Sequence, residues 1–193
     1  ANDYGIYLFT RANNSNITEN RINTNGTTNN YGIAIDTDSG NNVLIRNNIT
    51  TAGTGATNVG IYLLTRSTSN NVSNNIINTS GTDSNIGIRL DTVNNTLILN
   101  NTVNSGGSSS NNVGIRLDGN FFNNFTHNRV LSRGTASNYG VEFASGGINV
   151  VEYNNITTNG TTSTNVGIVM QATTTSNNIT NNVIVTNGTL FNG

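Results

Sequence analysis

The sequence predicts an all-β fold: a three-sided parallel β-helix, a solenoid of seven coils with about 27 residues in each. Three observations lead to this prediction. Glycine and asparagine residues recur at that interval along the whole chain, short segments of alternating apolar and polar residues lie between them, and proline is absent. Alternation with a period of two is typical of strands, and a fixed period over a whole chain is typical of a solenoid. Every interior strand of a solenoid must donate its N–H groups, which proline cannot do.

The first strand of each coil is marked by a glycine and an aliphatic pair, as in Gly5, Ile6 and Leu8. The glycine recurs as Gly5, Gly32, Gly60, Gly87, Gly114, Gly140 and Gly167. Glycine suits corners that need positive φ or that leave no room for a Cβ atom, so we expect corners at these positions. The coils then begin near Tyr4, Tyr31, Val59, Ile86, Val113, Tyr139 and Val166, and residues 1–193 form a single solenoid.

The other two strands of each coil lie on either side of a repeated asparagine. Its copies are Asn20, Asn47, Asn75, Asn101, Asn128, Asn154 and Asn182. Aliphatic or aromatic residues stand three residues before and two residues after it, and Thr or Ser stands four residues after it. We expect the asparagines to face inward as a ladder, each amide bonding the copies above and below, and the hydroxyl row to do likewise. A second glycine row, six residues after each asparagine, marks a further corner.

The amino-acid composition argues against several classes of function. Charged residues make up 9% of the chain, against roughly 25% in an ordinary soluble domain, and the formal net charge is −1. Because there is no basic patch, we do not expect a nucleic-acid partner. Cysteine is absent and there is one histidine, so we expect no metal site and no cofactor. No apolar run approaches the length of a membrane span.

The repeat, written xGIxL…NNVxxNNIxTxG, resembles the right-handed parallel β-helix repeats of polysaccharide lyases and hydrolases. It is closer still to the repeats of Asn/Thr-rich, adhesin-like surface proteins of archaea and bacteria. The resemblance implies a right-handed coil, as the crossover preference of parallel strands also does, and a location outside the cell. Neither end of the chain has the features of a cap, so we expect a segment of a longer solenoid or a filament subunit that stacks end to end.

Charged residues gather two and four positions after the first glycine in coils 4 to 6, where we expect the side chains to point outward. They are Arg89, Asp91, Arg116, Asp118 and Glu142, with Asp36 in the same row of coil 2. The resemblance to lyases and hydrolases implies calcium ligands or an acid–base pair here, with Asp91, Asp118 and Glu142 as candidate catalytic residues. The alternative is a ladder in which Arg and Asp neutralise one another. We favour the ladder, because the sequence encodes no long loop to surround a substrate.

Several other outward positions deserve a test. Six N-x-S/T sequons recur in two rows and are candidate glycosylation sites: Asn16, Asn71, Asn124 and Asn178 in one row, and Asn48 and Asn155 in the other. Glu19 and Arg46 occupy one position in successive coils and should pair. His127 shares that position, with Asn100 and Tyr153 as its expected neighbours. Tyr7 and Tyr62 share a row two coils apart, which gives a sugar-stacking surface little support.

These features favour an extracellular structural or adhesive rod without catalysis, such as part of a surface layer, sheath, fibre or adhesin stalk. Its expected partners are copies of itself or flanking coils, together with surface glycans, and its expected location is the cell surface. The alternative is a β-helix that binds carbohydrate or cleaves polysaccharide with the charged row of coils 4 to 6.

Overall fold

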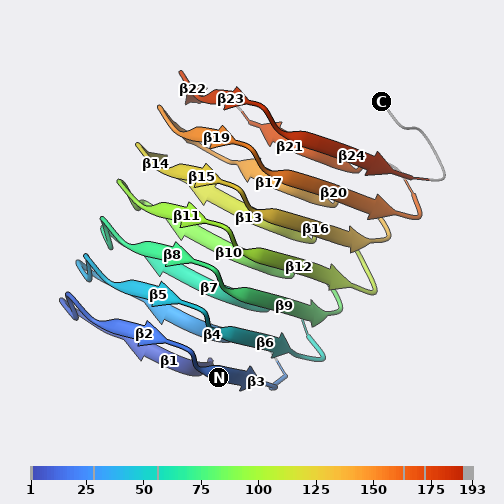
Figure 1. Ribbon diagram of the computed structural model, residues 1–193. Coiled ribbons are helices and arrows are strands. Elements are labelled where there is room, and N and C mark those ends of the chain that lie inside the picture. Colours follow the sequence, from blue (N-terminus) through green and yellow to red (C-terminus); the bar gives the residue numbers. More distant parts are fainter. Residues whose placement is uncertain (1, 28, 56, 163, 172, 189–193) are drawn as a thin grey trace.

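The computed structural model describes residues 2–27, 29–55, 57–162, 164–171 and 173–188. In this part of the chain every regular element is a β-strand, and the strands pair in parallel (Figure 1). The chain winds through seven coils, and equivalent asparagines that bond between neighbouring coils are 26 to 28 positions apart. Among the described residues no helix has the length and hydropathy needed to cross a membrane. The predicted all-β parallel solenoid is confirmed.

Three seven-stranded sheets form the faces of the rod. The first sheet consists of β1 (Asp3–Leu8), β4 (Asn30–Ile35), β7 (Val59–Leu64), β10 (Ile86–Asp91), β13 (Val113–Asp118), β17 (Tyr139–Phe143) and β21 (Val166–Met170). The second consists of β2 (Asn16–Thr18), β5 (Val43–Ile45), β8 (Asn71–Ser73), β11 (Leu97–Leu99), β15 (Asn124–Thr126), β19 (Val150–Glu152) and β23 (Asn178–Thr180). The third consists of β3 (Arg21–Thr24), β6 (Asn48–Ala52), β9 (Ile76–Gly81), β12 (Thr102–Gly107), β16 (Arg129–Gly134), β20 (Asn155–Gly160) and β24 (Val183–Asn187).

A small fourth sheet lies between the first and second sheets in coils 5 to 7. It pairs β14 (Asn120–Phe121), β18 (Gly146–Gly147) and β22 (Thr174–Thr175). Residues with left-handed backbone conformation lie at the corners, either singly or, as with Thr37 and Asp38, in consecutive pairs. Between the second and third sheets these residues have φ between 52° and 58°: Glu19, Arg46, Asn74, Asn100, His127, Tyr153 and Asn181. Most are not the Asn or Asp that tolerate this conformation best, so stacking must hold the corner in place.

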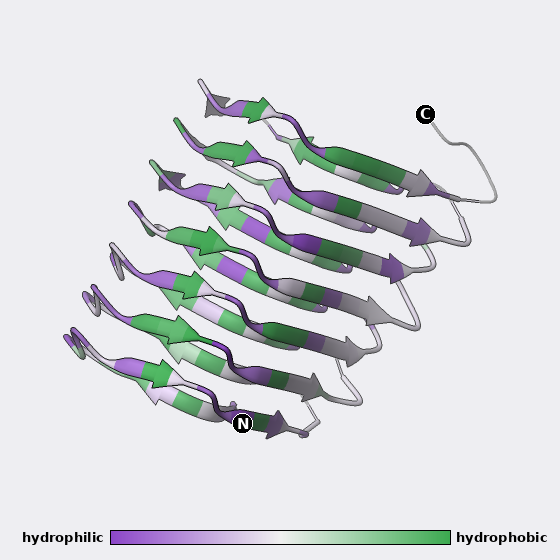
Figure 2. Cartoon of the chain, viewed as in Figure 1, coloured by the Kyte–Doolittle hydropathy of each residue, from purple (hydrophilic) through white to green (hydrophobic). Residues whose placement is uncertain are grey.

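The bore of the rod is a continuous apolar core to which all three sheets contribute. Its buried side chains come from the predicted apolar rows, including Ile33 and Ile35 of β4, Leu44 of β5 and Ile49 of β6. Hydrophobic segments recur at the same place in successive coils (Figure 2). Each coil therefore buries its apolar residues against the coils on either side of it, which a single coil could not do.

The first glycine row has a different role from the one expected. These glycines lie inside the strands of the first sheet, not at corners, and none has positive φ. A Cβ atom on Gly60 would lie 2.2 Å from Ile77 Cγ2 and 2.7 Å from the carbonyl oxygen of Gly87. Glycine is required because the first and third sheets approach closely across the bore, so the expected lack of room for Cβ is confirmed and the corner is not.

The predicted asparagine ladder is confirmed. From Asn20 to Asn182, each side-chain Nδ2 donates to Oδ1 of the copy in the next coil at 2.9–3.0 Å. The same Oδ1 also accepts the backbone N–H of the preceding copy, as Asn101 does from Asn75 at 2.9 Å. The ladder therefore bonds the backbone of each corner as well as the neighbouring side chains.

Two further asparagine rows, which the sequence analysis did not single out, also bond from coil to coil. One stands two residues before the first glycine and runs Asn30, Asn58, Asn85, Asn112, Asn138 and Asn165, with Nδ2–Oδ1 distances of 2.6–3.2 Å. The second glycine row makes room for it, since a Cβ atom on Gly81 would lie 2.3 Å from Asn58 Nδ2. The other row, which includes Asn42, Asn70, Asn123, Asn149 and Asn177, accepts backbone N–H groups of the preceding coil.

The hydroxyl row does not form the expected ladder. Its side chains face inward, but Oγ1 of Thr24, Thr51, Thr79 and Thr158 and Oγ of Ser105 have no hydrogen-bond partner within the described residues. Ser132 instead donates to the carbonyl oxygen of Asn112 at 2.6 Å. The hydroxyl groups are too short to bond from one coil to the next. Coils are about 4.8 Å apart, and a single hydroxyl oxygen cannot span that gap, whereas an amide places its donor and acceptor on opposite sides.

Candidate functional site

The outer face of the first sheet carries a second apolar cluster. At each glycine the strand bends, so the residue before the glycine and the residue two after it face outward together. The buried members of this outer cluster are Tyr31, Ala34, Val59, Ile86 and Val113, and two partly buried rings, Tyr62 and Tyr139, pack against them. The bend therefore makes a groove along the outside of the rod, which we call the outer groove.

Tyrosine rings fill the outer groove in coils 1 to 3. Tyr4 stacks on Tyr31 with ring centroids 5.0 Å apart, and Tyr31 stacks on Tyr62 at 5.6 Å. Tyr7 stacks on Tyr4 at 4.4 Å, and the guanidinium of Arg89 lies 4.9 Å from the centre of the Tyr62 ring. Such aromatic contacts contribute about 0.5–1.5 kcal/mol each beyond the burial of area.

The stacking explains why this column is a poor surface for sugars. Tyr31 is covered on one face by Tyr4 and on the other by Tyr62, and Tyr62 is covered by Tyr31 and Arg89. Tyr31 is 9% exposed. A sugar stacks on an open ring face, and these faces are already used by neighbouring coils. Tyr7 and Tyr62 are two coils apart, as the sequence indicated, and they are connected by the stacked rings of Tyr4 and Tyr31.

The charged row lies in the same groove, and its predicted register is confirmed: Arg89 pairs with Arg116, and Asp91 with Asp118. Asp91 is neutralised within its own coil, because Arg89 Nε donates to Oδ1 at 3.0 Å and Nη2 lies 2.8 Å from Oδ2. The Tyr62 hydroxyl also donates to Asp91 Oδ2. The side chains point outward as expected, but they are only partly exposed: the Asp91 side chain is 24% exposed and the Arg116 side chain is 32% exposed.

The other two candidate carboxylates are also bonded within the protein. Asp118 Oδ1 accepts from the Ser145 hydroxyl at 2.7 Å. Glu142, at 3% exposed, is the most buried charged group of the row. Its Oε1 accepts from Gln171 Nε2 at 2.7 Å, and its Oε2 lies 3.3 Å from Arg116 Nη1. Burial raises the pKa of the Glu142 carboxyl, and Arg116 offsets only part of this effect.

A pocket of about 370 Å³ opens in the outer groove beside Glu142. It spans coils 4 to 7 and is lined by Ser84, Ile86, Asn111, Val113, Arg116, Tyr139, Glu142 and Gln171. The pocket exists because Ile86 and Val113 occupy the row in which coils 1 and 2 carry Tyr4 and Tyr31. Of the lining residues, the sequence singled out Arg116 and Glu142 as a candidate site. Ile86, Val113 and Tyr139 were predicted only as the starts of coils, and Ser84, Asn111 and Gln171 carry no charge that marks them.

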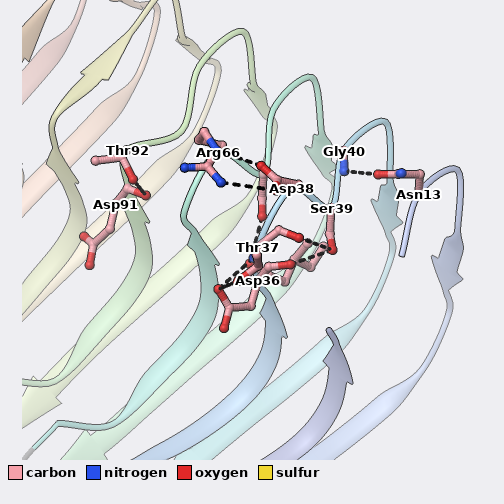
Figure 3. A network of polar contacts seen from close by, with 11 residues as sticks. Asn13, Asp36, Thr37, Asp38, Ser39, Gly40, Arg66, Asp91 and Thr92 are labelled. Carbon is pink, nitrogen blue, oxygen red and sulfur yellow. Dashed lines mark hydrogen bonds and ion pairs between the residues drawn. The ribbon is translucent and has the colours of Figure 1, made fainter. Parts of the chain in front are cut away.

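The fourth acidic residue of the row, Asp36, belongs to a turn instead of the groove floor (Figure 3). Its Oδ1 accepts from the N–H and the hydroxyl of Thr37 at 2.7 and 2.9 Å, and its Oδ2 accepts from the Tyr7 hydroxyl at 3.0 Å. Burial, together with this hydrogen bond, raises the pKa of Tyr7 to about 12. In the same turn Asp38 pairs with Arg66 of the next coil at 2.7 Å. These contacts make Asp36 a turn residue.

The outer face of the third sheet carries shallow hollows of about 430 and 420 Å³ on either side of Arg133. The Arg133 side chain, which lines both hollows, lies over Gly106 in the wall of the first. Their walls are otherwise amides, hydroxyls and glycines, so the hollows offer few distinctive groups to a ligand.

The remaining sequence predictions fall on the second and third sheets. Four of the six sequon asparagines are exposed, namely Asn16, Asn48, Asn155 and Asn178, whereas Asn71 and Asn124 are half-buried. The predicted pair is present, with Arg46 Nε 2.8 Å from Glu19 Oε1. His127 stacks on Tyr153 as expected, at 5.2 Å, while its other expected neighbour Asn100 bonds Asn74.

In the part of the chain that the structure describes, no three His, Cys, Asp or Glu side chains come together to hold a metal ion. Comparisons with models of known protein families, with curated proteins and with solved structures found no match to this chain.

Proposed function

We propose that the chain is an extracellular structural or adhesive rod that acts at the cell surface without catalysis. The observation that carries the proposal is the continuity of the ladder from Asn20 to Asn182, which passes through every coil without a break. Two further asparagine rows and the tyrosine column run in the same direction. A molecule in which the asparagine ladder bonds each coil to the next is suited to bear load along its axis.

The surface chemistry supports the same proposal. Two ion pairs within the chain, Arg89 with Asp91 and Arg116 with Glu142, neutralise four charged groups of the outer groove. The Asn/Thr-rich repeat resembles that of adhesin-like surface proteins. Exposed amides and hydroxyls hydrate well at any ionic strength, which suits a protein outside the cell. Four exposed sequon asparagines, among them Asn16 and Asn178, offer attachment points for glycans.

Polysaccharide cleavage by the charged row has less support. Asp91 already accepts from Arg89 and Tyr62, and Asp118 accepts from Ser145. An inverting pair needs one carboxylate free to activate water and the other free to protonate the leaving group. Calcium-dependent release of reducing ends from a polyuronide, abolished by Asp118→Ala, would overturn the rod proposal.

The direct test is immunogold electron microscopy of the source cells with antibody raised against this chain. We expect gold on the outer surface, on a layer, sheath or fibre. Surface proteolysis of intact cells is the matched measurement, because it should remove the antigen without lysing the cells. Gold confined to the cytoplasm, or antigen that resists proteolysis until lysis, would refute the proposed location.

A further inference from the structure

We propose that Tyr7 is a site of oxidative cross-linking, at which two copies of the chain join through a dityrosine bond. The co-reactant is a one-electron oxidant of the kind that a haem peroxidase makes from hydrogen peroxide. This reactivity belongs to the tyrosine column of coils 1 to 3 (Tyr4, Tyr7, Tyr31 and Tyr62), and it does not depend on the location proposed above for the rod.

The hydroxyl of Tyr7 already has a carboxylate as its hydrogen-bond acceptor. It donates to Asp36 Oδ2 at 3.0 Å, within the range of about 2.6–3.2 Å at which a base takes a proton. Because the pKa of Tyr7 is raised to about 12, the phenol is neutral at pH 7, and it loses an electron readily only if it loses its proton in the same step. Asp36 is placed to receive that proton. The Tyr4 hydroxyl differs, because Asn2 Nδ2 donates to it at 3.1 Å and no described carboxylate accepts from it.

The rings of the column are close enough to share an electron hole. The ring centroids of Tyr4 and Tyr7 are 4.4 Å apart. Those of Tyr4 and Tyr31 are 5.0 Å apart, and those of Tyr31 and Tyr62 are 5.6 Å apart. Stacked rings stabilise a hole, because the positive charge spreads over more than one π-system. The Tyr62 hydroxyl also donates to a carboxylate, that of Asp91. A hole formed elsewhere in the column can therefore move to Tyr7.

Tyr7 is the ring with a carboxylate acceptor that a second chain can reach. It is 41% exposed, whereas Tyr31 is buried between its neighbours and Tyr62 is half-buried. Two radicals must meet before they couple, so coupling between chains requires an exposed ring. The product is therefore expected at Tyr7 even when the oxidant first removes an electron from another ring of the column.

Exposure alone would favour a different tyrosine. Tyr153, at the corner between the second and third sheets, is 52% exposed. It stacks on His127 and lies outside the column, and its hydroxyl has no acceptor among the described residues. Tyr153 thus has the accessibility of Tyr7 without its carboxylate or its stacked tyrosines, which makes it a matched comparison within the same chain.

The cross-link forms in two steps. On each of two chains, the Tyr7 phenol gives an electron to the oxidant and a proton to Asp36, which passes the proton to water, and a neutral phenoxyl radical remains. The two radicals then form a carbon–carbon bond between ring carbons ortho to the oxygen, and each ring returns to a phenol when the hydrogen on that carbon moves to the oxygen. In total two tyrosines lose two electrons and two protons, which convert one hydrogen peroxide to two water molecules.

The test treats the full chain with a haem peroxidase and hydrogen peroxide. Dityrosine fluorescence follows the reaction, denaturing gel electrophoresis detects covalent species, and tandem mass spectrometry identifies the linked residues. We expect covalent dimers joined from Tyr7 to Tyr7 as the main product. A chain with one reactive tyrosine stops at the dimer, whereas a chain with two would form trimers and longer species. Product formed without peroxide would refute the oxidative origin.

Two variants and one control locate the site and its proton acceptor. Tyr7→Phe keeps the stacked ring and removes the hydroxyl, so the covalent dimer should be lost. Asp36→Asn can still accept the hydrogen bond, but an amide takes up a proton far less readily than a carboxylate does. The initial rate of dityrosine formation should therefore fall several-fold in this variant. The control is Tyr153→Phe, which removes the more exposed phenol and should leave the dimer yield unchanged.

Cross-links that map mainly to Tyr153, or a dimer yield that Tyr7→Phe leaves unchanged, would refute the proposal. An Asp36→Asn variant that reacts as fast as the parent chain would also refute it, because exposure alone would then govern the reaction. Circular dichroism shows whether each variant is folded. Tyr7→Phe, which removes a single hydroxyl, decides the site if Asp36→Asn does not fold.

Discussion

Truncation of one asparagine in the middle of the ladder should cost far more stability than the same truncation at its first position. Asn101 is 1% exposed, and its Oδ1 accepts from both the backbone N–H and the side chain of Asn75. Its Nδ2 donates to the carbonyl oxygen of Val72 at 2.9 Å and to Asn128 at 3.0 Å. Asn101→Ala removes all four contacts.

The expected loss of stability follows from the polar groups that the truncation leaves without partners. The buried N–H of Asn75 loses its acceptor, which costs about 1–3 kcal/mol, and the two contacts made by Nδ2 contribute about 0.5–1.5 kcal/mol each. We therefore expect a loss of about 2–6 kcal/mol. Asn20 donates to Asn47, but no described donor depends on its side chain. Asn20→Ala should accordingly cost about 0.5–1.5 kcal/mol, the value of one net hydrogen bond.

Urea unfolding followed by circular dichroism measures both variants, and amide hydrogen exchange shows where the change occurs. In Asn101→Ala the Asn75 N–H should lose its protection, whereas the Asn47 N–H, bonded to Asn75 Oδ1, should keep it. Because solenoids can unfold in parts, the exchange data also show whether a single free energy of unfolding is meaningful. Equal losses for Asn101→Ala and Asn20→Ala, or unchanged exchange at Asn75, would refute the reasoning.

Three further predictions concern the bore, the glycine row and the groove. Thr51→Val removes a buried hydroxyl without a described partner and should raise stability by up to about 1 kcal/mol, whereas Ser132→Ala loses a bonded hydroxyl and should lower it by about 1 kcal/mol, both by urea unfolding. Gly60→Ala places a Cβ against a side chain and a backbone oxygen and should cost about 1–3 kcal/mol or more, whereas Gly106→Ala meets only a flexible arginine and should cost less in thermal unfolding. Glu142→Gln should change how stability depends on pH. Because the folded pKa of Glu142 is raised, the parent chain should gain stability relative to the variant as pH falls towards about 4.3, the pKa of an unfolded Glu, and lose that gain as pH rises through the folded pKa.

Each of these predictions has a clear contrary result. Equal effects of Thr51→Val and Ser132→Ala would mean that the two hydroxyls have the same bonding. Gly106→Ala as harmful as Gly60→Ala would mean that backbone flexibility, not space, governs the glycines. A difference between the parent chain and Glu142→Gln that stays constant with pH, or that grows as pH rises, would contradict a raised pKa for this carboxyl.

The periodic part of this protein could be read from the sequence. Gly60, Ile61 and Leu63 recur in every coil as the same kinds of residue, and the asparagine row keeps its place, so strands, bore and ladder follow from local pattern alone. The two additional asparagine rows were also readable, since Asn30 and its equivalents stand two residues before the glycine. The repeat length and the alternation of inward and outward positions are enough to predict the strands, the bore and the asparagine rows, because each coil repeats the environment of the one before.

The tertiary structure decided which hydroxyls bond, where the strands bend and what the outer face becomes. The bend at Gly60 turns Val59 and Tyr62 to the same side, which alternation along a flat strand does not predict. Because both residues face the same side, Tyr31 and Tyr62 can stack although they belong to different rows. For the same reason a smaller residue, Val113, in the row of Tyr31 lines a pocket beside Glu142. The sequence by itself determined the solenoid, because its register is a one-dimensional property. The groove depended on the tertiary structure, because it arises from distances between residues that occupy different rows and different coils.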